Sequence, residues 1–126
     1  MLMTDPFRKP LAYHTRDKGS IVPLITVLYN IPGILLFDSC ESINRDPGTP
    51  ATPGWFWIAF FIPLDVPDER AREIIAAIRH AAENFDDRIF LHENPVFEEW
   101  RSFELMGDNT RAGSMAELLV SHPATR

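Results

Sequence analysis

Cys40 is the residue of this chain best suited to nucleophilic chemistry. It ends a short apolar run, two residues after Asp38, and stands just before a long polar segment. A thiol becomes a strong nucleophile when a base takes its proton, and any of the four histidines, His92 among them, could serve as that base. No cysteine motif surrounds Cys40, so a small hydrophobe at a strand end is the simpler interpretation. We expect no catalytic residues, and keep Cys40, Asp38 and His92 as the alternative set.

Carboxylates near this cysteine could form a hard-cation or general-acid site. Asp38, Glu41 and Asp46 are close in sequence, and a later glutamate could join them. Their spacing matches no fixed ligand pattern. The pair His92-Glu93 also lacks the second histidine, four positions on, that a zinc-protease helix requires. We therefore expect no metal site and no cofactor.

The stretch Trp55–Pro63 is the element around which the rest of the chain must be arranged. Its first eight residues carry no charge and no hydroxyl, and five of them are aromatic. Side chains alternate along a strand, so Trp55, Trp57 and Phe61 are expected on one face with Ala59. Trp and Tyr are enriched among residues that dominate binding energy. We therefore select Trp55, Trp57 and Phe61, with Trp100 from a later segment, as the candidate partner-binding residues.

Hydrophobic spacing predicts two main helices and about four strands. One helix is expected over residues 20–30, with Ser20 as its N-cap and Pro32-Gly33 after its end. The other follows Pro67 and carries an apolar stripe as far as residue 85. Strands are expected at residues 34–40, 55–63, 88–92 and 100–105. This order predicts one α+β domain, a roughly four-stranded and mostly antiparallel sheet with the two helices on one face.

The remaining segments are expected to be less regular. Residues 1–19 predict an irregular arm, residues 42–54 a long loop that is functional or mobile, and residues 122–126 a frayed tail. A turn is expected at residues 107–109. Residues 114–121 fit either a short helix capped by Ser114 or an edge strand. Plain alternation in the first strand places Leu36, Asp38 and Cys40 on one face.

Composition narrows the possible partners. The chain has 126 residues, enough for one domain, a net charge of −6 and a pI of about 5.1. An acidic chain is poorly suited to binding nucleic acid directly, although a basic protein remains a suitable partner. The one cysteine excludes an intrachain disulfide, and the longest apolar run is too short to cross a membrane. We expect a cytoplasmic protein with no signal peptide and no membrane contact.

Two helices can cover one face of a four-stranded sheet, but the sequence offers no third long helix for the other face. A bare apolar face is unusual for a monomer. We therefore expect a homodimer through that face, a second protein bound to it, or cover from the arm and the long loop.

Two short stretches resemble a known group of proteins. Residues 31–34 (Ile-Pro-Gly-Ile), followed by 39–41 (Ser-Cys-Glu), resemble a motif of small uncharacterised proteins encoded by phages and bacterial mobile elements. Residues 100–108 resemble their closing strand and turn. The resemblance spans about residues 20–121 and implies a shared α/β fold and a mobile-element origin, but no activity. It departs after Glu41, where those proteins have Gly-His and this chain has Ser42-Ile43.

These observations favour a small acidic, non-enzymatic protein that acts by protein–protein binding. Phage-encoded inhibitors of bacterial defence systems provide one model for such a protein. The alternative is an enzyme or small-ligand binder with Cys40 and Asp38 in a strand-end pocket beside the 42–54 loop. A purely structural homo-oligomer is the third possibility.

Overall fold

The chain folds into a four-stranded antiparallel sheet with helices. The computed structural model describes residues 8–16, 19–41, 54–96 and 98–125. In chain order the elements are α1 (Leu11–Thr15), α2 (Val22–Asn30), β1 (Leu35–Glu41), β2 (Trp55–Pro63), α3 (Asp68–Glu83), the 3₁₀ turn η1 (Asp86–Arg88), β3 (Ile89–Glu93), β4 (Trp100–Asp108), α4 (Asn109–Ser121) and the 3₁₀ turn η2 (Pro123–Thr125). The strand order is β1-β2-β4-β3. The predicted α+β class is confirmed.

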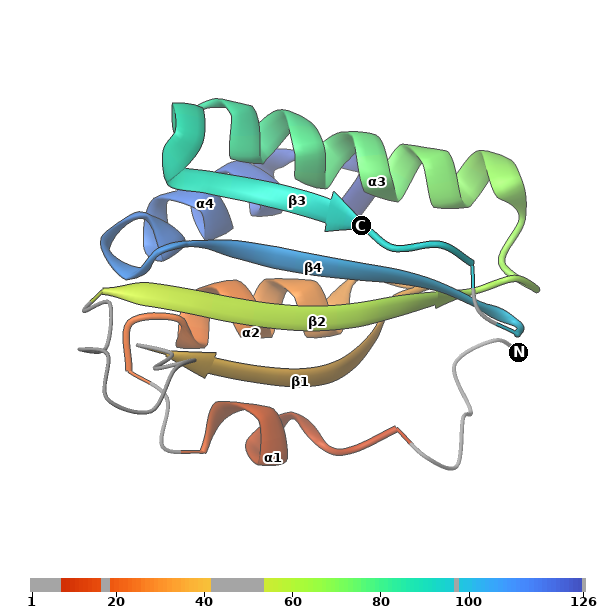
Figure 1. Cartoon of the computed structure of the whole chain (residues 1–126), viewed down its shortest axis with the longest axis horizontal. Helices are drawn as coiled ribbons and strands as arrows, with labels where there is room; N and C mark the ends of the chain where they lie inside the picture. Colours follow the sequence, from red (N-terminus) through yellow and green to blue (C-terminus); the bar gives the residue numbers. More distant parts are fainter. Residues whose placement is uncertain (1–7, 17–18, 42–53, 97, 126) are drawn as a thin grey trace.

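The core lies between the sheet and a layer formed by α2, α3 and α4. Figure 1 views the molecule from the opposite side of the sheet, so that β2 and β4 lie in front of α2 and α4. Alternation along β2 buries Phe56, Ile58, Phe60 and Ile62 almost completely against this layer. Phe60 stacks on Phe103 of the neighbouring strand β4, with ring centroids 5.2 Å apart. Fully burying each such side chain contributes about 1.5–3 kcal/mol to folding.

The helix α4 is a third helix on the same face, where the sequence predicted only two main helices. Its buried residues, Ala112, Met115, Ala116 and Leu119, recur at helical spacing and pack against the core. This settles the ambiguous stretch 114–121 as helix. The extra helix adds cover to the face that is already covered and none to the other.

The N-terminus of α2 is capped differently from the prediction. Ser20 is not the N-cap, because Ile21 occupies that position and makes no side-chain cap hydrogen bond. Instead the carboxylate of Glu41, at the end of β1, accepts hydrogen bonds from the backbone N–H groups of Gly19 and Ile21 and from the Ser20 hydroxyl. The negative charge of this carboxylate also interacts favourably with the positive end of the helix dipole. The capping group thus comes from the neighbouring strand.

A β-bulge in β1 changes which side chains share a face. Plain alternation predicted that Leu36 and Asp38 lie together, and this is wrong. Leu36 pairs with Phe60 and Asp38 with Ala59, so the bulge at Phe37 puts them on opposite faces. The Phe37 ring contacts Phe61 at 5.4 Å between centroids and therefore lies on the face away from the helices.

The ends of the chain are more regular than predicted. Within the expected irregular arm, residues 11–15 form α1, which packs against α2 beside the edge strand β1. Near the expected frayed tail, the Thr125 hydroxyl donates to the carbonyl oxygen of Leu119 at 2.6 Å and holds η2 against α4. The expected long loop falls outside the described residues except for Gly54. Among the described residues, no helix combines the length and apolar character needed to cross a membrane.

Gly107 lets β4 continue through the segment where a turn was predicted. β4 runs to Asp108, and Gly107 pairs with Ile89 at the start of β3. A Cβ atom at position 107 would lie 2.5 Å from the Arg88 carbonyl oxygen and 2.8 Å from Cα of Ile89. Only glycine permits this close approach of the two backbones.

Replacing Gly107 tests this packing. Gly107→Ala should lower the free energy of unfolding by about 2 kcal/mol, because the clash is with backbone and cannot be relieved by a side-chain rotation. Gly113→Ala is the matched control, since an added Cβ meets nothing within 4 Å on α4. It should raise stability by about 0.5–1 kcal/mol through its better helix propensity. Urea titration measures both, and a neutral Gly107→Ala would contradict the packing argument.

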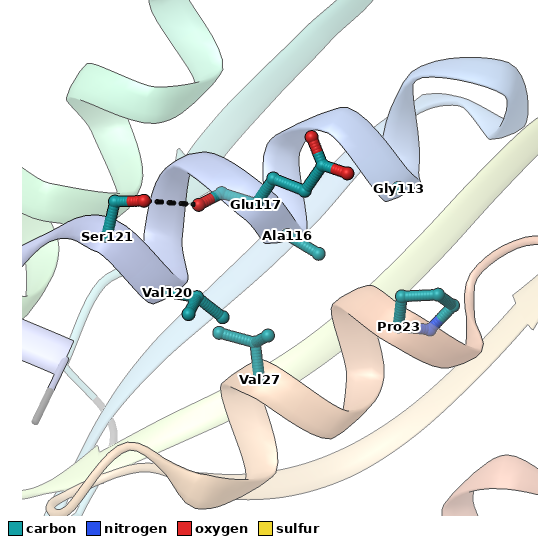
Figure 2. A pocket seen from close by; sticks show the side chains of 7 residues that line it. All are labelled: Pro23, Val27, Gly113, Ala116, Glu117, Val120 and Ser121. Carbon is teal, nitrogen blue, oxygen red and sulfur yellow. Dashed lines mark hydrogen bonds between the residues drawn. The ribbon is translucent and has the colours of Figure 1, made fainter.

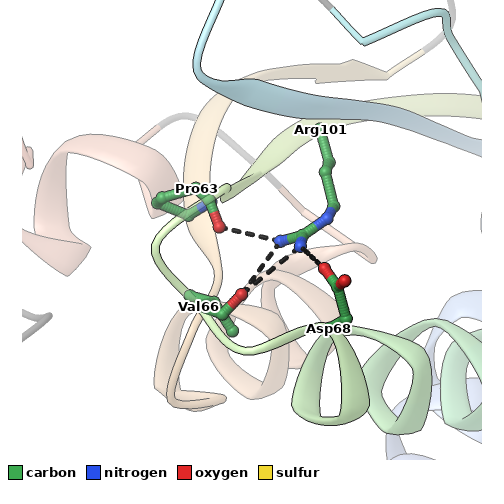
Figure 3. A network of polar contacts seen from close by, with 4 residues as sticks. All are labelled: Pro63, Val66, Asp68 and Arg101. Carbon is green, nitrogen blue, oxygen red and sulfur yellow. Dashed lines mark hydrogen bonds and ion pairs between the residues drawn. The ribbon is translucent and has the colours of Figure 1, made fainter.

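Arg101 ties the connection between β2 and α3 to β4. Figure 3 shows its guanidinium at the carbonyl oxygens of Pro63 and Val66 and at the carboxylate of Asp68. The donor–acceptor distances are 2.8 Å to Pro63, 3.3 Å to Val66 and 2.6 Å to Asp68. Only 13% of the Arg101 side chain is exposed, whereas Asp68 is 82% exposed, so it is the guanidinium that needs these acceptors in place of water.

Arg101→Lys should lower the free energy of unfolding by about 1–3 kcal/mol, because an ammonium cannot reproduce the planar fork that reaches three acceptors. Arg79→Lys provides the control. Arg79 is 48% exposed and its contact with Glu93 is 3.7 Å long, so its replacement should change stability by less than about 0.5 kcal/mol. Equal effects of the two substitutions in denaturant titrations would disprove the special role of Arg101.

Candidate binding surface

The face of the sheet away from the helices carries a concentration of aromatic side chains. We call it the open face. Strand register places Trp55, Trp57, Phe61 and Trp100 on it, together with Phe37 from the β1 bulge and Phe90 from β3. None of these six belongs to the core cluster. Of the described elements, no helix lies in front of β2 and β4 in Figure 1.

All four side chains selected from the sequence meet on this face. Trp55, Trp57, Phe61 and Trp100 are each half-buried, and Phe61 lies 5.5 Å from Trp100 between ring centroids. Phe61 and Trp100 thus contact each other across β2 and β4, whereas Trp55 and Trp57 lie further along β2, on the other side of Ala59.

Two exposed rings, Phe37 and Phe90, extend this surface and were not selected from the sequence. Phe37 is 59% exposed and Phe90 is 44% exposed, on the two edge strands. The orientation of Phe37 follows from the bulge, which has no signature in the sequence. Phe90 could have been found by alternation, but only once the order of the strands placed it beside Met106 and Trp57.

A row of three polar side chains and one alanine crosses the centre of the open face. Asp38, Ala59, Glu104 and His92 are consecutive neighbours across the four strands. Neighbouring strands are about 4.8 Å apart, so the backbones that carry the two carboxylates are roughly 10 Å apart on either side of Ala59. The indole N–H of Trp57 donates to Glu104 at 2.8 Å. We call Asp38, Ala59 and Glu104 the central row.

Of the alternative catalytic residues, Asp38 and Cys40 share a face of β1, but His92 is not brought to them. Cys40 lies on the edge strand β1 opposite Trp57, and His92 lies on the other edge strand, β3. Three strand spacings, about 14 Å, separate their backbones, which is too far for His92 to take a proton from Cys40. Within the described part of the chain, no three His, Cys, Asp or Glu side chains gather as a metal site would require. Asp46 lies outside the described residues.

A groove between α2 and α4 lies on the helical side of the molecule (Figure 2). Its volume is about 490 Å³, and its lining is mostly apolar: Pro23, Val27, Gly113, Ala116, Glu117, Val120 and Ser121. The Ser121 hydroxyl donates to the backbone carbonyl of Glu117 at 3.0 Å, and no histidine lines the groove to activate it. The groove contains none of the residues selected from the sequence.

No family model matches this chain, and neither a curated protein nor a solved structure matches it.

Asp108 lies at one end of the open face and joins it to the helical layer. It pairs with Trp55 across β2 and β4 and is also the N-cap of α4. Hydrogen bonds from the backbone N–H and the hydroxyl of Thr110 lower the pKa of its carboxyl below the ordinary 3.8, and the positive charges of Arg88 and Arg111 act in the same direction.

This lowered pKa predicts that the free energy of unfolding differs between the native protein and Asp108→Asn by an amount that depends on pH. Because the folded pKa lies below the unfolded one, the ionised carboxylate stabilises the fold above about pH 5 and that contribution is lost as the pH falls through the lowered pKa. Asn keeps a capping oxygen but carries no charge. Urea titrations should find Asp108→Asn less stable at pH 7 and closest to the native protein at pH 2–3. A difference that grows on acidification would contradict this assignment.

Proposed function

We propose that this protein acts by binding another protein through the open face. The observation that carries the proposal is the segregation of six aromatic side chains onto the sheet face opposite the helices, outside the core. Aromatic residues dominate binding energy at protein interfaces. Large exposed apolar patches on monomers also usually have a function.

The charge on the open face favours a basic protein as the partner. The four strands contain one Lys or Arg residue, Arg101, and it lies on the helical side, where it holds the β2–α3 connection. The one histidine in the strands, His92, is the cross-strand neighbour of Glu104. Asp38 and Glu104 lie on the open face. Nucleic acid would be repelled by these carboxylates and by the net charge of −6.

A homodimer through this face is the weaker alternative. A second copy centred on the same surface would place its own Asp38 and Glu104 against these carboxylates. Like charges brought together at an interface cost several kcal/mol. A different protein with a complementary charge avoids this repulsion.

Catalysis is also less well supported than binding. Cys40 and His92 lie on opposite edges of the sheet, and the groove between α2 and α4 has no nucleophile and base in contact. Binding requires only the surface that the sheet already presents.

The sequence resemblance suggests one class of partner. Small acidic proteins of phages that inhibit bacterial defence systems would act by covering a basic surface, and an acidic aromatic sheet face suits that task. The support for this part of the proposal is the short motif at residues 31–41 together with the net charge of −6.

The proposal is tested by affinity capture with matched variants. Phe37→Ser removes a ring that is 59% exposed on the open face, and Val120→Ser removes a side chain that is 58% exposed on α4. We expect Phe37→Ser to weaken the capture of a specific partner from a lysate of the source cells by about tenfold or more. Val120→Ser should capture that partner as the native protein does.

Two results would overturn the proposal. One is a captured species that is retained equally by Phe37→Ser and Phe61→Ser. The other is a concentration-dependent dimer in light scattering that both substitutions dissociate, since the face would then be occupied by a second copy. Circular dichroism of each variant establishes that the fold is retained.

A further inference from the structure

The central row divides the open face into two aromatic halves with a small residue between them. Along β2 the side chains on this face are Trp57, Ala59 and Phe61, and a cross-strand carboxylate lies on each side of Ala59. Ala59 is only 8% exposed, so larger neighbouring side chains cover most of it. Aromatic side chains therefore flank Ala59 along the strand, and carboxylates flank it across the strands.

Both carboxylates are oriented by hydrogen bonds within the protein. Glu104 Oε1 accepts the indole N–H of Trp57 at 2.8 Å, and Asp38 Oδ1 accepts the backbone N–H of Ser39 at 2.8 Å. In the described part of the chain neither carboxylate forms an ion pair. Each therefore presents negative charge at the surface in a defined position, and this lowers the entropy cost of binding a cation.

We propose that the central row binds an arginine side chain of the partner, with its guanidinium above Ala59, between Asp38 and Glu104 and against the ring of Trp57 or Phe61. This inference rests on the proposed function, because it identifies the chemistry of the partner segment that the open face accepts.

The geometry favours a guanidinium over the other cations. A metal ion needs oxygen ligands at about 2.0–2.6 Å, and two carboxylates on backbones roughly 10 Å apart do not supply a closed shell. A guanidinium is planar, has five N–H donors, and stacks on aromatic faces while it pairs with carboxylates. A lysine ammonium provides a point charge and lacks this planar stacking surface.

The central row also explains why the aromatic face carries charge in its middle. A face that bound only apolar groups would leave Asp38 and Glu104 desolvated and unpaired in the complex, at a cost of several kcal/mol. A partner arginine compensates both groups at once. The charge thus acts as a specificity element that rejects purely apolar partners.

The test uses a short peptide in which three arginines alternate with glycine, titrated into the full chain. Because the Trp57 indole N–H donates to Glu104, its proton NMR resonance reports directly on that carboxylate. We expect a saturable shift of this resonance with the arginine peptide. The same peptide with citrulline, which is neutral and nearly isosteric, should cause none.

Matched variants assign the effect to the central row. Asp38→Asn or Glu104→Gln should each weaken peptide binding about three- to fivefold, and the double variant about tenfold or more. Glu117→Gln, on the helical side, is the control and should bind as the native protein does. Raising the salt from 50 to 500 mM should weaken binding to the native protein and have less effect on the double variant.

Three outcomes would overturn this inference: no shift with the arginine peptide, an equal shift with the citrulline peptide, or unchanged binding in the double variant. The proposed binding function of the open face can hold even if this inference about arginine is wrong. If affinity capture depends on Phe37 and Phe61 but not on Asp38 and Glu104, the open face is a binding surface whose partner does not use arginine at the central row.

Discussion

The unequal cover on the two faces of β2 is the constraint on which the rest of this structure depends. Both faces of that strand are aromatic, because five of its residues are Trp or Phe. The described helices α2, α3 and α4 pack on one face and bury it almost completely, whereas the rings on the other face remain partly exposed. The hydrophobic effect that drives the core together thus leaves an apolar surface on the opposite side.

Polar contacts join the sheet to the N-terminal ends of α2, α3 and α4. Glu41 caps α2 from the end of β1, Arg101 holds the start of α3 from β4, and Asp108 caps α4 at the point where β4 ends. Each contact joins a helix N-terminus to the strand beside it, where unpaired N–H groups or carbonyl oxygens need partners. These contacts fix the helices relative to the sheet without using the aromatic side chains of the open face.

The open face combines apolar area with placed charge. Aromatic rings supply area that can be removed from water, and in the proposed binding role the carboxylates at its centre would discriminate among partners by charge. The surface therefore suits recognition by contact better than it suits chemistry, since the residues that could have formed a nucleophile and base lie on separate edge strands. A rigid sheet also keeps these groups in place before a partner arrives, which reduces the ordering cost of binding.

Local patterns in the sequence were enough to predict the elements that depend on periodicity. The alternation of Trp55–Pro63 and the apolar stripe of α3 identified both elements and which side chains of β2 share a face, because these follow from bonded geometry. Features that depend on distant contacts were not predictable in this way. Glu41 replaced Ser20 as the capping group because the fold brings β1 to the start of α2.

Tertiary structure decided the parts of the candidate site that periodicity could not supply. The bulge at Phe37 and the central row arise from pairing between strands, and the third helix on the covered face arises from packing of α4 against the core. Asp38 and Glu104 become neighbours of Ala59 only through cross-strand register, which periodicity within one segment cannot specify. The sequence by itself thus determined that a surplus aromatic strand exists, and long-range packing decided which of its sides stays open and which charges lie on it.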